Sequence, residues 1–155
     1  MAENHIVYLG KLIGNIQSFE TALRFFLDRL NPASSPCLPA GKFYYQLRVG
    51  DSVPENAFTN FDTLGDLVDK YNRAIRQKDA ALVVDRSVVL LRDLLAHGRV
   101  FADAPDETRL AIIKFDRPEE GSARVTDCAL MTEQWFQDRI DFVLAQLKKV
   151  EQASK

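Results

Sequence analysis

The sequence predicts a mainly α-helical protein, a four-helix bundle with a β-hairpin inserted before the last helix. Apolar residues recur every three or four positions along four long segments, as in helices that bury one face. Two short β-favouring runs flank a turn just before the last of these segments. The chain has 155 residues, of which 46% are hydrophobic, and this length suits one domain with its own core better than two. We therefore expect a single helical domain over residues 1–155.

The first predicted helix covers residues 6–30 and ends before Asn31-Pro32, because proline disfavours a helical conformation in the residue that precedes it. One apolar stripe runs along this helix: Leu9, Leu12, Ile16, Phe19, Leu23, Phe26 and Leu30. Gly10 and Gly14 lie inside the helix, and each weakens it by up to about 1 kcal/mol relative to alanine. The helix is therefore expected to depend on tertiary packing or on a close helix neighbour at these glycines.

Two further helices are predicted after an irregular segment at residues 31–62, which is rich in Pro, Ser, Gly and Asn. Thr63 is the expected N-cap of a helix over residues 64–77. Its apolar face carries Leu64, Leu67, Val68, Tyr71 and Ile75. A third helix is expected over residues 79–98, and Gly98 stands where a left-handed C-terminal cap is common. Its apolar stripe carries Val84, Val88, Leu91 and Leu95.

The pattern then changes to two strands and a last helix. Residues 108–115 and 123–131 favour strands, and Pro118 and Gly121 lie in the turn between them, which predicts a β-hairpin. Thr132 is the expected N-cap of the fourth helix. The apolar face of that helix carries Phe136, Ile140, Val143, Leu147 and Val150.

Charge and composition narrow the classes of function. The net charge of −2 gives no sign of the broad basic surface that is typical of duplex-DNA-binding proteins. The N-terminal region lacks the features of a secretory signal, and every apolar run is far shorter than the ~20 residues of a transmembrane helix, so we expect a cytoplasmic protein without a membrane partner. Cys37 and Cys128 follow neither a metal-ligand spacing nor a disulfide framework. We expect two reduced thiols, no metal and no cofactor.

The stretch LLRDLLAHGRVF, residues 90–101, carries the candidate chemistry. Arg92 and His97 are five positions apart, which separates them by about 140° around a regular helix. They can converge only if the last turn unwinds beside Gly98, or if a two-fold-related partner brings its own copies to the same cleft. Asp93 lies four residues before His97 on the same face, where a carboxylate can orient the imidazole and favour its protonated form.

An arginine with a protonatable histidine suits phosphodiester cleavage. The fixed cation offsets charge on the pentacoordinate phosphorus, and the histidine moves protons at the attacking or leaving oxygen. RNA is the expected substrate because its 2′-hydroxyl supplies an internal nucleophile, so no metal is demanded. The same residues also fit a structural alternative, in which Arg92 is a surface or salt-bridged residue and His97-Gly98 is an ordinary helix end.

The run RDLLAHG, with Arg92, Asp93 and His97, resembles the motif of the HEPN family. Proteins of this family are small helical bundles, named for prokaryotic and eukaryotic nucleotide-binding members, that carry an Arg, a polar residue, a short spacer and a His. The resemblance implies a four-helix bundle, a homodimer that brings two copies of the motif together, and metal-independent RNA cleavage in toxin, antiviral or RNA-processing systems. Other members bind nucleotides or assemble with protein partners without known nuclease activity, and a partner such as an antitoxin is also consistent with the resemblance.

Two residues depart from the family pattern. Asp93 stands where the family often has Asn, and it places a negative charge where an RNA phosphate would approach. Arg99 stands two residues after His97, where toxin branches that pair with a nucleotidyltransferase often have Tyr, so that partner is not implied. Glu20, beside the apolar stripe of the first helix, can brace Arg92 in a folded bundle. We count Asp93, Glu20 and Arg99 as supporting residues.

Two functions follow as expectations. The first is a metal-independent endoribonuclease in which Arg92 holds phosphate and stabilises the transition state, while His97 is the general acid or base. The second is a non-catalytic dimeric module that uses the same face to bind a nucleotide or a protein partner. The motif favours the first function, whereas the low net charge and Asp93 favour the second. The ribonuclease is the function we expect.

Overall fold

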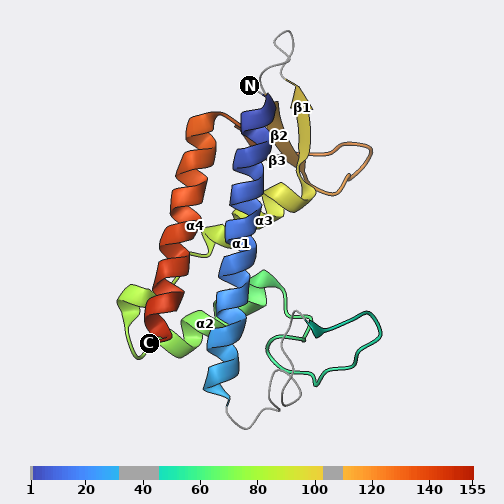
Figure 1. Ribbon diagram of the computed structural model, residues 1–155. Coiled ribbons are helices and arrows are strands. Elements are labelled where there is room, and N and C mark those ends of the chain that lie inside the picture. The colour runs from blue at the N-terminus through green and yellow to red at the C-terminus, as the bar shows by residue number, and fades with distance from the viewer. Residues whose placement is uncertain (1, 32–45, 103–109) are drawn as a thin grey trace. The chain divides into compact units, whose positions relative to one another are not determined.

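A computed structural model describes residues 2–31, 46–102 and 110–155 and shows a mainly helical protein with a small antiparallel sheet (Figure 1). The described residues form four α-helices: α1 (Ala2–Leu30), α2 (Leu64–Ile75), α3 (Ser87–His97) and α4 (Glu133–Ala153). They also form three strands in the order β1-β2-β3: β1 (Arg99–Ala102), β2 (Leu110–Phe115) and β3 (Val125–Leu130). The predicted helical class is confirmed, and the sheet has one strand more than the predicted hairpin.

The chain divides into two compact units, each assembled from segments that are distant in sequence. The first unit contains Met1–Gln17 and Asp85–Ala145, and the second contains Ser18–Val84 and Gln146–Lys155. The long helices α1 and α4 each contribute their first part to the first unit and their last part to the second. The expectation of a single domain stays a prediction.

In the first unit, the start of α1 lies beside the start of α4 (Figure 1). The Nε2 atom of His5 is 2.9 Å from the carbonyl oxygen of Met131, just before α4. The hydroxyl of Tyr8 donates a hydrogen bond to the carboxylate of Glu133. The Tyr8 ring stacks on the fully buried Phe136 with 5.9 Å between ring centroids. Polar bonds and aromatic packing therefore both join the two helix starts.

The sheet begins directly where α3 ends. Gly98 is the C-cap of α3 and has an extended backbone (φ −69°, ψ 151°), so the predicted left-handed cap is wrong. A Cβ atom on this residue would lie 2.4 Å from the carbonyl oxygen of Leu94 and 2.7 Å from Cγ1 of Ile112. Gly98 therefore allows a close approach between the helix end and β2, which a side chain would prevent, while its extended backbone leads straight into β1.

In the second unit, α2 is the helix that the sequence predicted most closely. Thr63 is its N-cap and forms a capping box with Asp66, in which each side chain accepts a hydrogen bond from the other residue's backbone N–H. The five residues predicted to form its apolar face are all buried. The ring of Phe26 from α1 packs edge-on against Tyr71 with 4.8 Å between centroids, and the Tyr71 hydroxyl donates to the carbonyl of Leu82. The Tyr71 ring therefore packs in the hydrophobic core while its hydroxyl keeps a hydrogen-bond partner.

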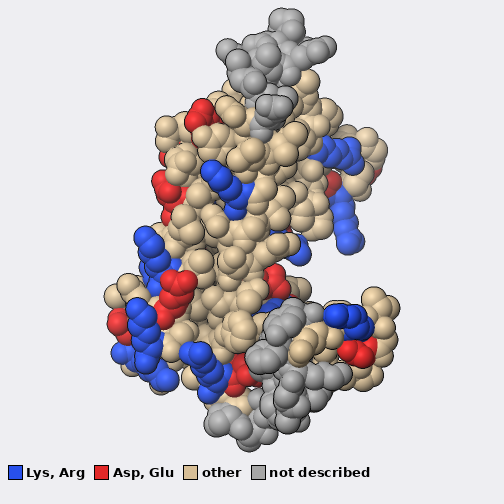
Figure 2. Space-filling model, viewed as in Figure 1, with Lys and Arg blue, Asp and Glu red and all other residues tan. Residues whose placement is uncertain are grey.

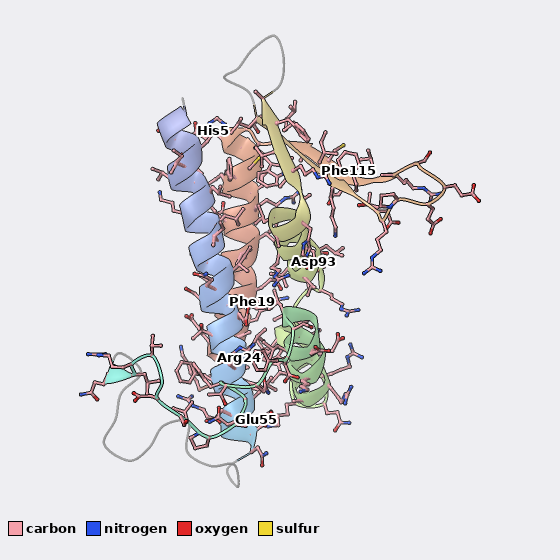
Figure 3. The ribbon with its side chains drawn as sticks, turned by 90° about the vertical axis from the view of Figure 1, so that its right-hand side faces the viewer. His5, Phe19, Arg24, Glu55, Asp93 and Phe115 are labelled. Atoms are coloured by element: carbon pink, nitrogen blue, oxygen red, sulfur yellow. The ribbon has the colours of Figure 1, made fainter. Side chains whose placement is uncertain are left out.

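Arg24 on α1 holds the irregular segment that precedes α2 (Figure 3). Its guanidinium donates to the carbonyl oxygens of Ala57, Asn60 and Asp62 and to the carboxylate of Glu20, and its side chain is only 12% exposed. The carboxylate balances the buried charge, and the three carbonyls satisfy backbone acceptors that the segment itself leaves unpaired. Arg24 thus ties residues 57–62 of the predicted irregular segment to α1, and Lys70 of α2 adds an ion pair with Asp62.

The third helix is shorter than predicted. Residues Ala80–Leu82 form a separate 3₁₀ turn, and α3 begins only at Ser87. Asn72 of α2 explains part of the interruption, because its side chain bonds both the N–H and the C=O of Val84, which fixes that residue outside a helical ladder. The predicted strand segments are largely confirmed as β2 and β3. The predicted thiol at Cys37 lies outside the described residues.

Candidate functional site on helix α3

Helix α3 has a buried side and an exposed side. Val88, Leu91 and Leu94 are buried at the spacing of three that a helix places on one face. The helix starts at Ser87, whose backbone N–H donates to the carboxylate of Asp85 at 2.8 Å. This local bond satisfies one of the unpaired donors of the first turn, because an acidic side chain before the helix can act as an N-terminal acceptor.

Arg92 and Asp93 form an ion pair on the exposed side of α3. The Nη1 atom of Arg92 is 3.2 Å from Oδ1 of Asp93, and the two side chains are 46% and 35% exposed. Solvent screens such a pair, so it contributes little to the stability of the fold. The pair affects anion binding instead, because the Asp93 carboxylate lowers the positive potential that Arg92 presents to an approaching anion.

His97 is the last residue of α3 and is exposed to solvent. Within the described part of the chain, its imidazole makes no hydrogen bond. Asp93, which the sequence suggested as the group that orients this ring, contacts Arg92 instead. Since both Arg92 and His97 belong to one regular helix, about 140° of rotation separates them, and the helix does not unwind at His97 to bring them together.

The remaining supporting residues lie elsewhere. Glu20 belongs to the second unit, where it pairs with Arg24 at 2.9 Å. Arg99 is the first residue of β1 and is exposed, and the central carbon of its guanidinium lies 5.5 Å from the centroid of the Phe115 ring. Only Gly98 therefore separates the candidate histidine from a second cation, which lies over an aromatic ring.

The buried side of α3 borders a cavity, but the candidate residues do not line it. This cavity of about 350 Å³ lies within the first unit, between α3, β3 and α4. Its lining includes Leu90, Leu94, Trp135, Arg139 and Phe142. The candidate catalytic residues thus lie on a convex helix surface, and they would need a second surface to enclose a substrate.

Charged groups are mixed over the face of the molecule shown in Figure 2, where basic and acidic side chains alternate. Within the described ranges, no cluster of three or more His, Cys, Asp or Glu side chains is arranged to hold a metal ion. The described helices also include none with the length and apolar character required to cross a membrane.

Two features of the structure escaped the sequence analysis. No sequence pattern indicated the role of Arg24, because the backbone carbonyls that it binds belong to an irregular segment without a motif. Arg99 meets Phe115 because β1 pairs with β2. The sequence did not predict β1, since Arg99–Ala102 is a strand of only four residues.

Comparison with known proteins finds no matching family model, no similar curated protein and no similar solved structure.

Proposed function

We propose that this protein is a HEPN-like four-helix bundle that cleaves RNA as a cytoplasmic homodimer, without a metal ion, in a toxin or defence system. Arg92 and His97 are its catalytic residues. The observation that carries the proposal is the exposure of both side chains on α3, which leaves them accessible to a phosphodiester. Because one α3 directs them to different sides, a second copy of the chain is required to complete the site.

In the proposed reaction, His97 accepts the proton of the 2′-hydroxyl, and the 2′-oxygen attacks the adjacent phosphorus. The bond between phosphorus and the 5′-oxygen breaks, the leaving oxygen takes a proton from water, and the His97 imidazolium returns its proton to the solvent. The products are a 2′,3′-cyclic phosphate and a 5′-hydroxyl. Arg92 stabilises the charge on the phosphoryl oxygens. A guanidinium has five N–H donors, so its single bond to Asp93 leaves others for phosphate.

A second candidate function is a non-catalytic dimeric module that binds a nucleotide or a protein partner. The ion pair between Arg92 and Asp93 favours it, because a carboxylate 3.2 Å from the guanidinium opposes the approach of an RNA phosphate. A protein partner such as an antitoxin would tolerate this mixed pair better than a polyanion would.

The deciding experiment is incubation of the purified protein with single-stranded RNA in the presence of EDTA. We expect cleavage to 2′,3′-cyclic ends, and a loss of at least about 100-fold in Arg92→Ala and in His97→Ala, with little change in melting temperature. Arg73→Ala is the matched control, because Arg73 is an exposed arginine on α2. Absence of cleavage by the folded wild-type dimer, or equal activity in the His97→Ala protein, would contradict the proposal.

A further inference from the structure

The three-stranded sheet turns one face toward α3 and leaves the other uncovered by the described helices. Ile112 is 1% exposed, lies against Gly98 at the end of α3, and pairs directly with Ala129, the least exposed residue of β3. Side chains alternate between the two faces along a strand, and directly opposed residues share a face. The neighbours of these two residues therefore point away from α3.

The outer sheet face is defined by this alternation and by the strand register. Its eight residues are Arg99, Phe101, Ala111, Ile113, Phe115, Val125, Cys128 and Leu130. Phe101, Val125 and Leu130 are between 46% and 50% exposed, which is high for large apolar side chains. The single charged member is Arg99, and it is positive.

An aromatic and cationic pair lies at one end of the outer sheet face, where β1 begins and β2 ends. Arg99 places its guanidinium 5.5 Å from the Phe115 ring, and Phe101 follows Arg99 by two residues on the same strand and face, about 7 Å along it. Phe101 and Arg99 are exposed and Phe115 is half-buried. Flat aromatic and guanidinium groups that a sheet leaves accessible are the groups on which unpaired bases stack, and the same arginine can bind a phosphate between bases.

We propose that the outer sheet face binds single-stranded RNA, with bases stacked on Phe101 and Phe115 and a phosphate held by Arg99. This inference rests on the proposed function, since it names how the substrate strand is held beside His97. The chain itself supports the connection, because His97 is separated from Arg99 only by Gly98, whose close packing fixes the end of α3 against the sheet.

The size of the face favours RNA over a protein partner. Three strands about 4.8 Å apart and at most six residues long cover roughly 300 Å². A stable protein interface needs about 800 Å² from each partner, whereas sheet surfaces of this size hold two or three stacked bases. The lone positive charge, without an acidic side chain among the eight, also matches a polyanion.

The test measures binding of a short fluorescent 2′-O-methyl RNA, which lacks the free 2′-hydroxyl and so separates binding from cleavage. Phe101→Leu keeps an apolar side chain but removes the flat ring, and we expect at least about fivefold weaker binding. Arg99→Gln should weaken binding and reduce its dependence on salt concentration. The matched control is Val100→Ala on the same strand, whose side chain points to the other face and should leave affinity unchanged.

Each outcome separates this inference from the proposed function. Wild-type affinity in both Phe101→Leu and Arg99→Gln, or no binding by the wild-type protein, overturns the inference even if RNA cleavage depends on His97. Self-association that Phe101→Leu abolishes, without RNA binding, assigns the face to a second copy and also overturns it. RNA binding that depends on Phe101, in a protein that cleaves no RNA, supports the inference and contradicts only the catalytic proposal.

Discussion

Gly98 has no room for a side chain, because a Cβ atom would lie within 3 Å of both the Leu94 carbonyl oxygen and the Ile112 side chain. We expect Gly98→Ala to lower the free energy of unfolding by about 1–3 kcal/mol, as overpacking does elsewhere. Gly10→Ala is the contrasting change, since a Cβ there meets nothing within 4 Å and should stabilise α1 by up to about 1 kcal/mol. Urea unfolding of both variants measures the difference. A stable Gly98→Ala protein would contradict the close packing described above.

A second prediction at the residue scale concerns Tyr71. Burial raises the pKa of Tyr71 from 10.0 to about 12, and the phenol donates to the Leu82 carbonyl in its neutral form. A raised pKa in the folded state means that the neutral phenol's contribution is fully present below pH 10 and is lost as the pH rises through 12. We expect Tyr71→Phe to be about 1 kcal/mol less stable at pH 7 and to lose less stability over that alkaline range. Denaturant unfolding at several pH values provides the measurement, and identical slopes for both proteins would disprove the assignment.

The β2–β3 hairpin carries the prediction at the scale of one element. Its turn is closed by paired hydrogen bonds between Glu119 and Ser122, and its two central residues, Glu120 and Gly121, both have positive φ angles of 50° and 81°. Such a turn favours Asn-Gly, and glutamate adopts the left-handed region at a cost. Glu120→Asn should therefore raise the free energy of unfolding by about 0.5–1 kcal/mol. Gly121→Ala should lower it, and thermal unfolding of the two variants would show opposite shifts; shifts of the same sign would argue against this turn.

At the element scale, local signals decided how well the sequence predicted the structure. Helix α2 was predictable because its N-cap at Thr63 and the spacing of its apolar residues are both local features of the sequence. Strand β1 was not, because all four of its residues are exposed and it exists only through pairing with β2. The α3 start was also misplaced, since the side chain of Asn72, distant in sequence, holds Val84 outside the helix.

The candidate site was predictable in position but not in its contacts. Helical spacing alone indicated that Arg92 and His97 point to different sides, and α3 has both residues in one regular helix. The partner of Asp93 could not be read from spacing, because it bonds its immediate neighbour Arg92 rather than the residue one turn away. Such choices depend on side-chain rotamers that a sequence pattern does not specify.

At the scale of the whole molecule, the proposed site requires two chains, and mixed dimers test this requirement. The Arg92→Ala and His97→Ala proteins are each expected to be inactive, whereas a mixture allowed to exchange subunits should regain part of the activity. The gain arises if one of the two composite sites then keeps an intact Arg92 from one chain and an intact His97 from the other. Cleavage assays before and after subunit exchange provide the measurement. No recovery despite demonstrated exchange would mean that each chain supplies both residues to its own site.

Both compact units take part of α1 and part of α4, the first and last helices of the described chain. During synthesis on a ribosome, neither unit can therefore complete its core until α4 has emerged. The earlier segments, including the apolar faces of α1 and α2, must remain soluble or protected until that moment. A nascent chain arrested before residue 133 should consequently be sensitive to protease throughout, and protection of both units should appear only after α4 has left the exit tunnel.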